Sequence, residues 1–216
     1  MKLIVGLGNP GKIYEQTRHN IGRLAAKELG KRHKVILKRG LFGSSLSAKC
    51  RIKNQVCLLA VPVFYMNLSG GAVKSLIKKH KVGLEDLIVV FDDLDLEQGR
   101  LKIKSGGSSG GHKGLESIIA SLGTGDFCRL RIGIGRPENK FAVRLENNGL
   151  ASNSQSHKLE NNGLASHSQS QISDYVLSGF KKNEKTPIAE AIAKACDAVE
   201  LWVEAGAQQT MNIINR

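Results

Sequence analysis

The sequence predicts a single-domain α/β protein with a helical C-terminus, on three observations. Its 216 residues suit one domain of ordinary size. Apolar runs of the kind found in strands that are buried on both faces recur along the chain. Helical apolar spacing appears between these runs, and this alternation is typical of α/β folds. We therefore expect a sheet with helices packed against it.

Seven segments are predicted as strands. They are KLIV (2–5), HKVILK (33–38), SLSAKCRI (45–52), QVCLLA (55–60), DLIVVFD (86–92), GRLKIK (99–104) and CRLRIGI (128–134). Several of them, LIVVF above all, are continuously apolar rather than alternating, which indicates strands covered on both faces.

Four segments carry helical spacing. Ile21, Leu24, Ala25 and Leu29 recur at i, i+3, i+4 and i+8 before Gly30, and Val73, Leu76 and Ile77 mark a second helix. HKGLESIIASLG (112–123) is a third. The last is an Ala-rich segment from Pro187 to about Gly206, in which Pro187 suits a first turn.

A tandem repeat interrupts this pattern. RLENNGLASNSQSH (144–157) is followed at once by KLENNGLASHSQSQ (158–171). Two copies are too few for a solenoid, and their polar composition offers little to offset the entropy of ordering. We expect an exposed, mobile loop inserted in the domain at about 144–171, with His157 and His167 as solvated bystanders.

Composition narrows the class of protein. No apolar stretch approaches the length of a membrane span, and the apolar run after Lys2 is far too short for a signal peptide, so we expect a cytoplasmic protein. The four cysteines, Cys50, Cys57, Cys128 and Cys196, lack motif spacing and are interpreted as buried thiols of a reducing compartment.

The net charge of +13 and a pI near 9.7 point to a polyanionic partner, with nucleic acid as the first candidate. The cations also alternate at strand period. Arg100, Lys102 and Lys104 share one face of one predicted strand, and Arg129 and Arg131 share a face of another. Such a ladder would suit a phosphate backbone.

The segment GLGNPG (6–11) spells the dinucleotide fingerprint G-x-G-x-x-G, but its context does not fit. Helical spacing begins only near Ile21, well after Gly11, and the next predicted strand leads into Lys38 and Arg39 instead of an acid for the ribose. We interpret GLGNPG as a strand-to-loop turn in which glycines permit unusual dihedral angles and Pro10 stiffens the chain.

Three polar residues are expected to meet beyond the carboxyl ends of the strands. Asp92 ends the run LIVVF, His19 follows the first strand, and Asn9 lies in the glycine turn. Ligands of open α/β sheets bind in that crevice. A carboxylate beside an imidazole fixes its tautomer and raises its basicity, so that it can take a proton from water.

Five segments carry a resemblance to a known family. GLGNPGKIYEQTRHNIG, PVFYMNLSG, FDDLDLEQG, GGSSGGHKGL and RLRIGIGRP, in this order, resemble the signature segments of bacterial-type peptidyl-tRNA hydrolases. The resemblance runs from residue 1 to about 204 apart from the repeat. It implies a twisted mixed β-sheet flanked by helices on both faces, in a monomer that needs no metal or other cofactor.

The implied reaction is hydrolysis of the ester between a peptide, or an N-blocked amino acid, and the 3′-terminal ribose of tRNA, which recycles tRNA from stalled translation. By motif position, His19 corresponds to the general base and Asp92 to its partner, and Asn9 and Asn67 hold the substrate near the ester. Tyr14, Tyr65 and Met66 would line the same site, and Lys104 and Arg131 match basic positions that contact tRNA.

The chain departs from the family at Lys113, where many members have an asparagine. A lysine cannot accept a hydrogen bond, so the position could instead meet a terminal phosphate. The repeat also separates segments that lie close together in the family.

Other chemistries fit less well. Ser108 and Ser109 each spell G-x-S-x-G, but a triad would have to recruit His157 or His167 from the repeat. Lys113 precedes a glycine, which breaks the phosphate-loop pattern, and DDLDLEQG lacks the spacing of a calcium loop. The rival from another class is an RNA-binding protein of the same fold that has lost hydrolysis.

Overall fold

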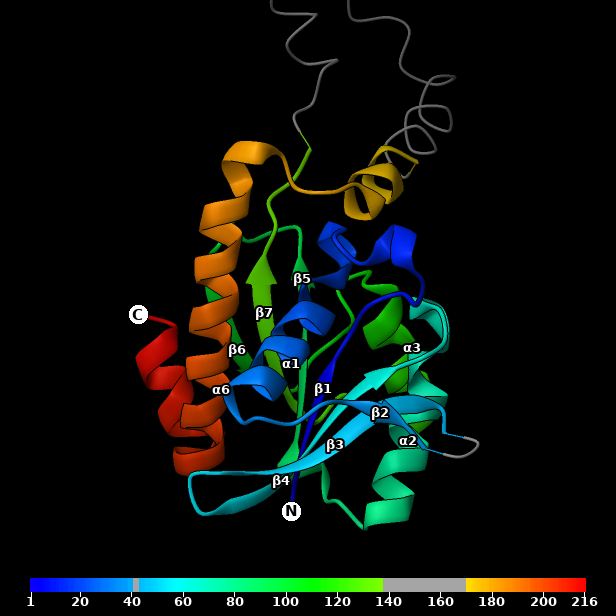
Figure 1. Ribbon diagram of the computed structural model, residues 1–216, viewed down its shortest axis with the longest axis vertical. Coiled ribbons are helices and arrows are strands. Elements are labelled where there is room, and N and C mark those ends of the chain that lie inside the picture. Colours follow the sequence, from blue (N-terminus) through cyan, green and yellow to red (C-terminus); the bar gives the residue numbers. More distant parts are fainter. Residues whose placement is uncertain (41–42, 138–169) are drawn as a thin grey trace, which may run out of the picture.

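The computed structural model describes residues 1–40, 43–137 and 170–216, and its centre is a seven-stranded sheet in the order β2-β3-β4-β1-β5-β7-β6 (Figure 1). The strands are β1 (Lys2–Gly6), β2 (Lys38–Arg39), β3 (Ser45–Ile52), β4 (Gln55–Pro62), β5 (Leu87–Asp93), β6 (Leu101–Ser105) and β7 (Cys128–Gly133). The β1/β4, β1/β5 and β5/β7 pairs are parallel, whereas β2/β3, β3/β4 and β6/β7 are antiparallel. The predicted α/β fold with a mixed sheet is confirmed.

Helices cover both faces of the sheet. α1 (Ile21–Arg32) and α6 (Lys185–Ile214) pack on one face, and α2 (Ser69–His80) and α3 (Lys113–Leu122) pack on the other (Figure 1). Residues 170–177 are also helical. Five short 3-10 turns complete the description: η1 (Lys12–Tyr14), η2 (Arg18–Asn20), η3 (Met66–Leu68), η4 (Leu84–Asp86) and η5 (Lys182–Glu184).

The continuously apolar strands contribute side chains to two hydrophobic cores. In β5, Ile88 and Val90 join the core under α1 and α6, whereas Leu87, Val89 and Phe91 join the core under α2 and α3. Successive side chains of a strand point to opposite faces, so both faces must be apolar when both are covered. This explains why LIVVF does not alternate, and it leaves Asp92 as the first polar residue at the strand's end.

Close packing explains two of the glycines near the first strand. A Cβ on Gly22 would lie 2.1 Å from the carbonyl oxygen of Val90, and one on Gly6 would lie 2.2 Å from the carbonyl oxygen of Gly22. Only a glycine contact lets α1 approach β1 and β5 this closely. Of the glycines in GLGNPG, Gly11 alone has a positive φ, of 99°. The expected unusual dihedral angles are therefore confined to Gly11.

The predicted strand at 33–38 is wrong for most of its length. Only Lys38 and Arg39 pair with β3, while the amide of Val35 donates to Gly30 at the end of α1. Val35 and Leu37 pack against the core. Their alternation thus reflects burial of two side chains without the backbone pairing that defines a strand.

The last helix begins and ends differently from the prediction. It starts at Lys185, which puts Pro187 in the first turn as expected, and it continues to Ile214. At Gly206 the backbone leaves the helical region, with φ 77° and ψ 176°. Beyond this kink, Asn215 reaches the edge of the sheet. Its side-chain amide donates to the carbonyl of Ile103 and accepts from the amide of Ile103, both at 2.8 Å.

Most of the tandem repeat, residues 144–169, lies outside the described residues, so the expectation of a mobile loop there stays a prediction. Ser170 and Gln171, its last two residues, belong to the helix at 170–177. The predicted loop is wrong for these two.

All four cysteines are free thiols. Cys57, Cys128 and Cys196 are buried as predicted, whereas Cys50 is partly exposed.

Candidate active site

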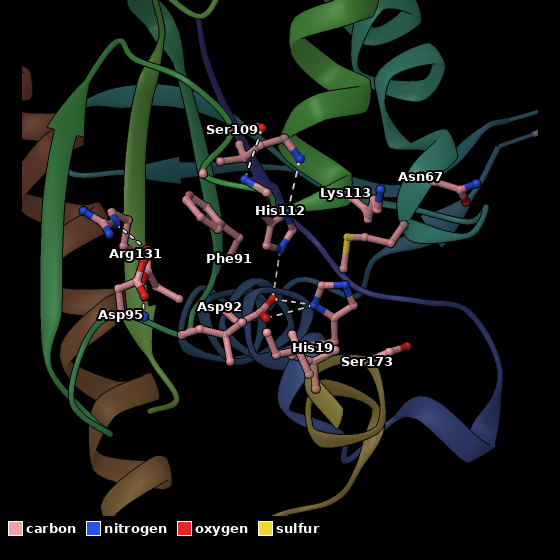
Figure 2. Close-up of a pocket in the computed structure, with 18 of the residues that line it drawn as sticks. His19, Asn67, Phe91, Asp92, Asp95, Ser109, His112, Lys113, Arg131 and Ser173 are labelled. Carbon is pink, nitrogen blue, oxygen red and sulfur yellow. Dashed lines mark hydrogen bonds and ion pairs between the residues drawn. The ribbon is translucent and has the colours of Figure 1, made fainter. Parts of the chain in front are cut away.

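A pocket of about 800 Å³ opens beyond the carboxyl ends of β1 and β5 (Figure 2). Every residue that the sequence nominated for the site lines it: Asn9, Tyr14, His19, Tyr65, Met66, Asn67, Asp92, Lys104, Lys113 and Arg131. They come from segments up to 122 positions apart, from Asn9 to Arg131. The predicted meeting of these residues in one crevice is therefore what the fold produces.

His19 and Asp92 are in direct contact. The Nδ1 atom of His19 lies 2.9 Å from both carboxylate oxygens of Asp92. His19 sits in η2, just before α1, and Asp92 is at the end of β5, so the close packing of α1 on β5 brings them together. With Nδ1–H donating to the carboxylate, the Nε2 lone pair of His19 is left without a partner among the described residues.

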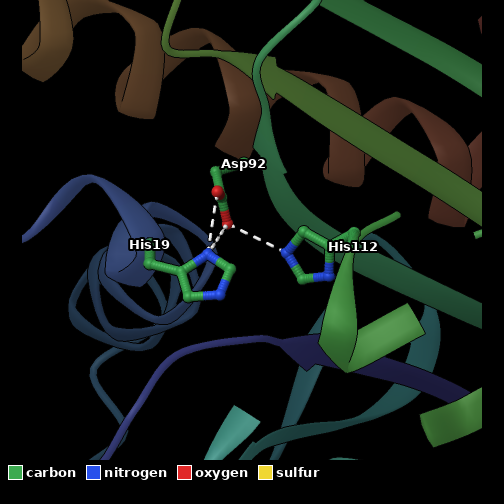
Figure 3. Close-up of side chains that lie close together, drawn as sticks. All are labelled: His19, Asp92 and His112. Atoms are coloured by element: carbon green, nitrogen blue, oxygen red, sulfur yellow. Dashed lines mark hydrogen bonds and ion pairs between the residues drawn. The ribbon is translucent and has the colours of Figure 1, made fainter. Parts of the chain in front are cut away.

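A second histidine contacts the same carboxylate, and the sequence analysis missed it. The Nε2 atom of His112 lies 3.0 Å from Oδ1 of Asp92, on the opposite side from His19 (Figure 3). His112 is the N-cap of α3, where its Nδ1 accepts from the backbone amides of Gly114 and Leu115 at 3.1 and 3.2 Å. The signal that could have revealed it is a polar residue immediately before a helical pattern.

The hydrogen bonds of His112 fix its tautomer. Because Nδ1 accepts two amide hydrogens, the ring hydrogen is on Nε2 and is donated to Asp92. Asp92 thus receives one N–H from each imidazole. Burial by itself raises the pKa of the Asp92 carboxyl, but the charges and hydrogen bonds of His19 and His112 outweigh burial and hold this pKa below its ordinary value. Asp92 is ionised at neutral pH.

His19, Asp92 and His112 are also close enough to be considered as a metal site, since their ligand atoms lie within 4.8 Å of one another. The donor chemistry does not favour this. A metal would need the Nε2 lone pair of His112, and the cap at Nδ1 requires a hydrogen on that nitrogen. The absence of a metal requirement remains a prediction on this ground.

Asn9 is held rigidly and keeps one donor group available. Its side-chain oxygen accepts from the amide of Met66 at 2.8 Å, while its backbone amide and carbonyl are both bound by the side chain of Asn20. Asn9 is buried, yet it lines the pocket. Its NH₂ group has no hydrogen-bond partner among the described residues, so it can donate to a bound ligand.

Aromatic side chains line one side of the pocket rim, and a segment that is distant in the sequence lines the other. Tyr14 and Tyr65 meet edge to face with ring centroids 6.4 Å apart, and Asn67 is exposed beside them. The helix at 170–177 contributes a second wall. Arg18 secures that wall, because its guanidinium binds Ser178 and Glu184, both at 2.7 Å.

The predicted basic ladder exists, but its members differ. Lys102 lies opposite Arg131, and Lys104 opposite Arg129, so all four share one face. Arg129 is buried and donates to the carbonyls of Gly107, Ser108 and Gly125, so its role as part of a phosphate track is not supported. Arg131 is paired with Asp93.

Lys113 begins α3 and is largely exposed, with its ammonium 3.7 Å from the carboxylate of Glu116.

The serine-nucleophile alternative loses further support. His112 follows Ser109 by three residues, but its ring atoms are committed to Asp92 and to the α3 cap, and the Ser109 hydroxyl accepts from Gly111. Among the described residues, no hydrogen bond therefore pairs Ser108 or Ser109 with a histidine base, and His157 and His167 lie outside them.

Comparison with known proteins agrees with this site. A family model described as peptidyl-tRNA hydrolase matches residues 3–159 and 146–216, two ranges that overlap across the tandem repeat. Curated peptidyl-tRNA hydrolases of Geobacillus thermodenitrificans and Syntrophomonas wolfei are 42% and 40% identical to the chain, and each alignment covers 100% of both proteins.

The chain belongs to the peptidyl-tRNA hydrolase family. It is an enzyme of this type, and the predicted resemblance to the bacterial-type peptidyl-tRNA hydrolases is confirmed. The crystal structure of peptidyl-tRNA hydrolase from Acinetobacter baumannii superimposes with a TM-score of 0.81 at 32% identity, covering 100% of this chain and 94% of that one. Among the described residues of this family member, no helix is both long enough and apolar enough to cross a bilayer.

Proposed function

We propose that the chain hydrolyses the ester between a peptide, or an N-blocked amino acid, and the 3′-terminal ribose of tRNA, with His19 as the general base. The observation that carries this proposal is the state of the two ring nitrogens of His19: Nδ1 is bound to a buried carboxylate, and Nε2 has no partner among the described residues that line the pocket. A general base placed in this way contributes about 100- to 10,000-fold in rate.

In the proposed reaction, Nε2 of His19 takes a proton from a water molecule as that water attacks the ester carbonyl. The tetrahedral intermediate then collapses, and the proton on His19 passes to the leaving 3′-oxygen of the ribose. Asp92 stays ionised throughout and stabilises the imidazolium that forms in between. No covalent enzyme intermediate is required, because an ester is already an activated acyl group.

Asn9 supplies a donor for the oxygen on which charge develops. Its free NH₂ group lies in the same pocket as His19, and its other contacts keep it from reorienting. A single preorganised donor of this kind contributes about 100- to 1,000-fold. Asn67, on the rim, would bind the first amide of the peptide, which an unblocked aminoacyl-tRNA lacks.

The remaining nominated residues would bind the substrate. Tyr14, Tyr65 and Met66 line the place for the 3′-terminal nucleotide, and Lys104, Arg131 and Lys113 supply positive charge for phosphates. We further propose that the enzyme acts as a cytoplasmic monomer on released peptidyl-tRNA, in ribosome rescue, with no cofactor.

The test is deacylation of N-acetylaminoacyl-tRNA by the purified chain and by His19→Ala. We expect kcat to fall about 100- to 10,000-fold in the variant, with circular dichroism and tRNA affinity retained. His33→Ala is the matched control, since His33 pairs with Glu200 on the surface away from the pocket. EDTA should not change turnover.

The rival function makes the opposite prediction. Tight binding of the tRNA by the wild-type chain without deacylation would favour an RNA-binding protein that has lost hydrolysis. Equal rates in the wild type and His19→Ala would remove His19 from the mechanism, and loss of turnover in EDTA would point to a metal.

A further inference from the structure

One exposed stripe of side chains leads away from the pocket along α2. It begins at Asn67, which lines the pocket, and continues through Gly71, Lys74, Lys78 and Lys81, all of them exposed. Within α2 this spacing places Gly71, Lys74 and Lys78 on one face of the helix, while Asn67 precedes the helix in η3 and Lys81 follows it as the C-cap. From Gly71 to Lys78 the stripe spans roughly 10 Å at the helical rise per residue.

The charge of this face is not balanced within α2. Its sequence, SGGAVKSLIKKH, contains no acid. Lys74 and Lys78 stand at i, i+4, where like charges destabilise a helix. In the described part of the chain, no ion pair joins an α2 lysine, or Lys81 just after it, to an acid. The pKa of His80 is lowered by burial and then by the charges of Lys49 and Lys79, so positive charge dominates this end as well.

Two adjacent glycines at the start of α2 have different surroundings. A Cβ on Gly70 would lie 2.0 Å from the carbonyl oxygen of Ser117, so the packing of α2 against α3 explains that glycine. A Cβ on Gly71 would meet nothing within 4 Å. A glycine inside a helix weakens it, and nothing in the fold requires one at this exposed position. Gly71 instead leaves the surface between Asn67 and Lys74 without a side chain, as a closely approaching ligand backbone would need.

Two of the cations that line the pocket are already paired. Arg131 binds Asp93 and Arg136 binds Asp95, whereas Lys104 is in no ion pair among the described residues. Figure 2 shows Arg131 and Asn67 on opposite sides of the His19–Asp92 pair. The α2 lysines are therefore more available to phosphates than these two arginines are. Because the stripe begins at Asn67, which lines the pocket, a ligand that extends out of the pocket past Asn67 could reach these lysines.

The name α2 lysine stripe is used below for Gly71, Lys74, Lys78 and Lys81. We propose that the α2 lysine stripe binds the sugar–phosphate backbone of the tRNA whose 3′ end occupies the pocket. This inference rests on the proposed function. Lysines that contact phosphates raise affinity without reading sequence, and they release counterions, which makes binding depend on salt. The stripe would hold the RNA some distance from the ester and leave the chemical step unchanged.

The test compares two substrates. One is full-length N-acetylaminoacyl-tRNA, and the other is a short oligonucleotide carrying the same ester at its 3′ end. For the combined variant Lys74→Gln, Lys78→Gln and Lys81→Gln, we expect KM for the full tRNA to rise roughly tenfold, with kcat unchanged. The plot of log kcat/KM against log salt should become shallower by about one unit per lysine. Kinetics on the short ester should not change.

A charge-matched control separates a local contact from the loss of net charge. Lys31→Gln, Lys185→Gln and Lys194→Gln remove the same charge from α1 and α6, on the other face of the sheet, and should leave KM for the tRNA unchanged. Gly71→Gln sharpens the test. It should preserve or raise the melting temperature, because glycine is a poor helix former, while it raises KM for the full tRNA alone.

The proposal is overturned if the α2 variant and its control behave alike, or if KM for the short ester rises as much as KM for the tRNA. Failure of the wild type to hydrolyse either ester would refute the proposed function instead. In that case, the fluorescence anisotropy of labelled, uncharged tRNA at several salt concentrations still decides whether the α2 lysine stripe binds RNA.

Discussion

His19 and His112 offer the same side chain to the same carboxylate, yet of these two only His19 keeps a ring nitrogen without a partner among the described residues. Each donates one ring N–H to Asp92, at 2.9 and 3.0 Å. The difference lies in the second ring nitrogen: that of His19 has no partner in the part of the chain that the structure describes, whereas that of His112 accepts from two backbone amides at the start of α3. The role of a histidine in this site is therefore decided by the nitrogen that does not touch the aspartate.

Replacing the shared carboxylate tests both histidines and should have the largest effect. In Asp92→Asn the negative charge is lost, and if the amide oxygen replaces Oδ1, which both imidazoles contact, its NH₂ group replaces Oδ2 and faces the Nδ1–H of His19. We expect kcat to fall about 1,000- to 10,000-fold, as when the aspartate that orients another catalytic histidine becomes an amide. Single-turnover deacylation of N-acetylaminoacyl-tRNA measures this. A fall of less than tenfold would show that His19 does not depend on Asp92.

Two substitutions of His112 separate its cap from its contact with Asp92. His112→Ala removes both, and we expect the free energy of unfolding to fall by about 1 kcal/mol from the lost cap. We also expect kcat to fall roughly tenfold, because a hydrogen bond to a charged group contributes about 1.5 kcal/mol or more. His112→Asn should restore most of the stability, since asparagine is a good N-cap, but not the activity. Urea unfolding and steady-state kinetics measure the two effects.

The pH profile distinguishes positioning from a structural role. With one donor fewer, Asp92 should hold a proton on His19 more strongly. The acidic limb of kcat/KM in His112→Asn should therefore move to higher pH. A variant that loses activity with an unchanged profile would make His112 a purely structural residue.

Acid titration should give the smallest effect, and it concerns stability. The pKa of Asp92 is lowered on folding from an ordinary value of 3.8. Its ionised form therefore stabilises the fold above about pH 4, and this contribution is lost as the pH falls further. The difference in the free energy of unfolding between wild type and Asp92→Asn should shrink from pH 6 to pH 3. Asp197→Asn, at an exposed aspartate paired with Arg32, serves as the control; a constant difference for Asp92→Asn would contradict the lowered pKa.

Much of the fold could be predicted because burial controls it directly. The apolar runs at β1, β4 and β5 and the helical spacing in α1 and α6 record which faces are covered, and that information is local in the sequence. The strand predicted at 33–38 failed for the complementary reason. Val35 and Leu37 are partly buried and alternate like strand residues, but pairing depends on where β3 runs, which the segment itself does not encode.

The residues of the site also divide into those that the sequence could predict and those that it could not. Asp92 and His19 could be nominated because the end of an apolar strand has a fixed meaning in an open sheet. His112 escaped notice because its importance depends on the direction of its two ring nitrogens, which is a property of the α3 cap in three dimensions. The burial of Arg129 was missed for a related reason, since three carbonyls of surrounding loops form its binding site.

The contact between Asn215 and Ile103 bears on self-association. β6 is the last strand of the sheet, and an open edge strand can recruit a strand from another copy of the chain. One amide side chain occupies both the N–H and the C=O of Ile103, at the centre of β6. A foreign strand could not pair along β6 without displacing it. The edge that bears Lys102 and Lys104 is thereby protected against aggregation while its cations stay in solvent.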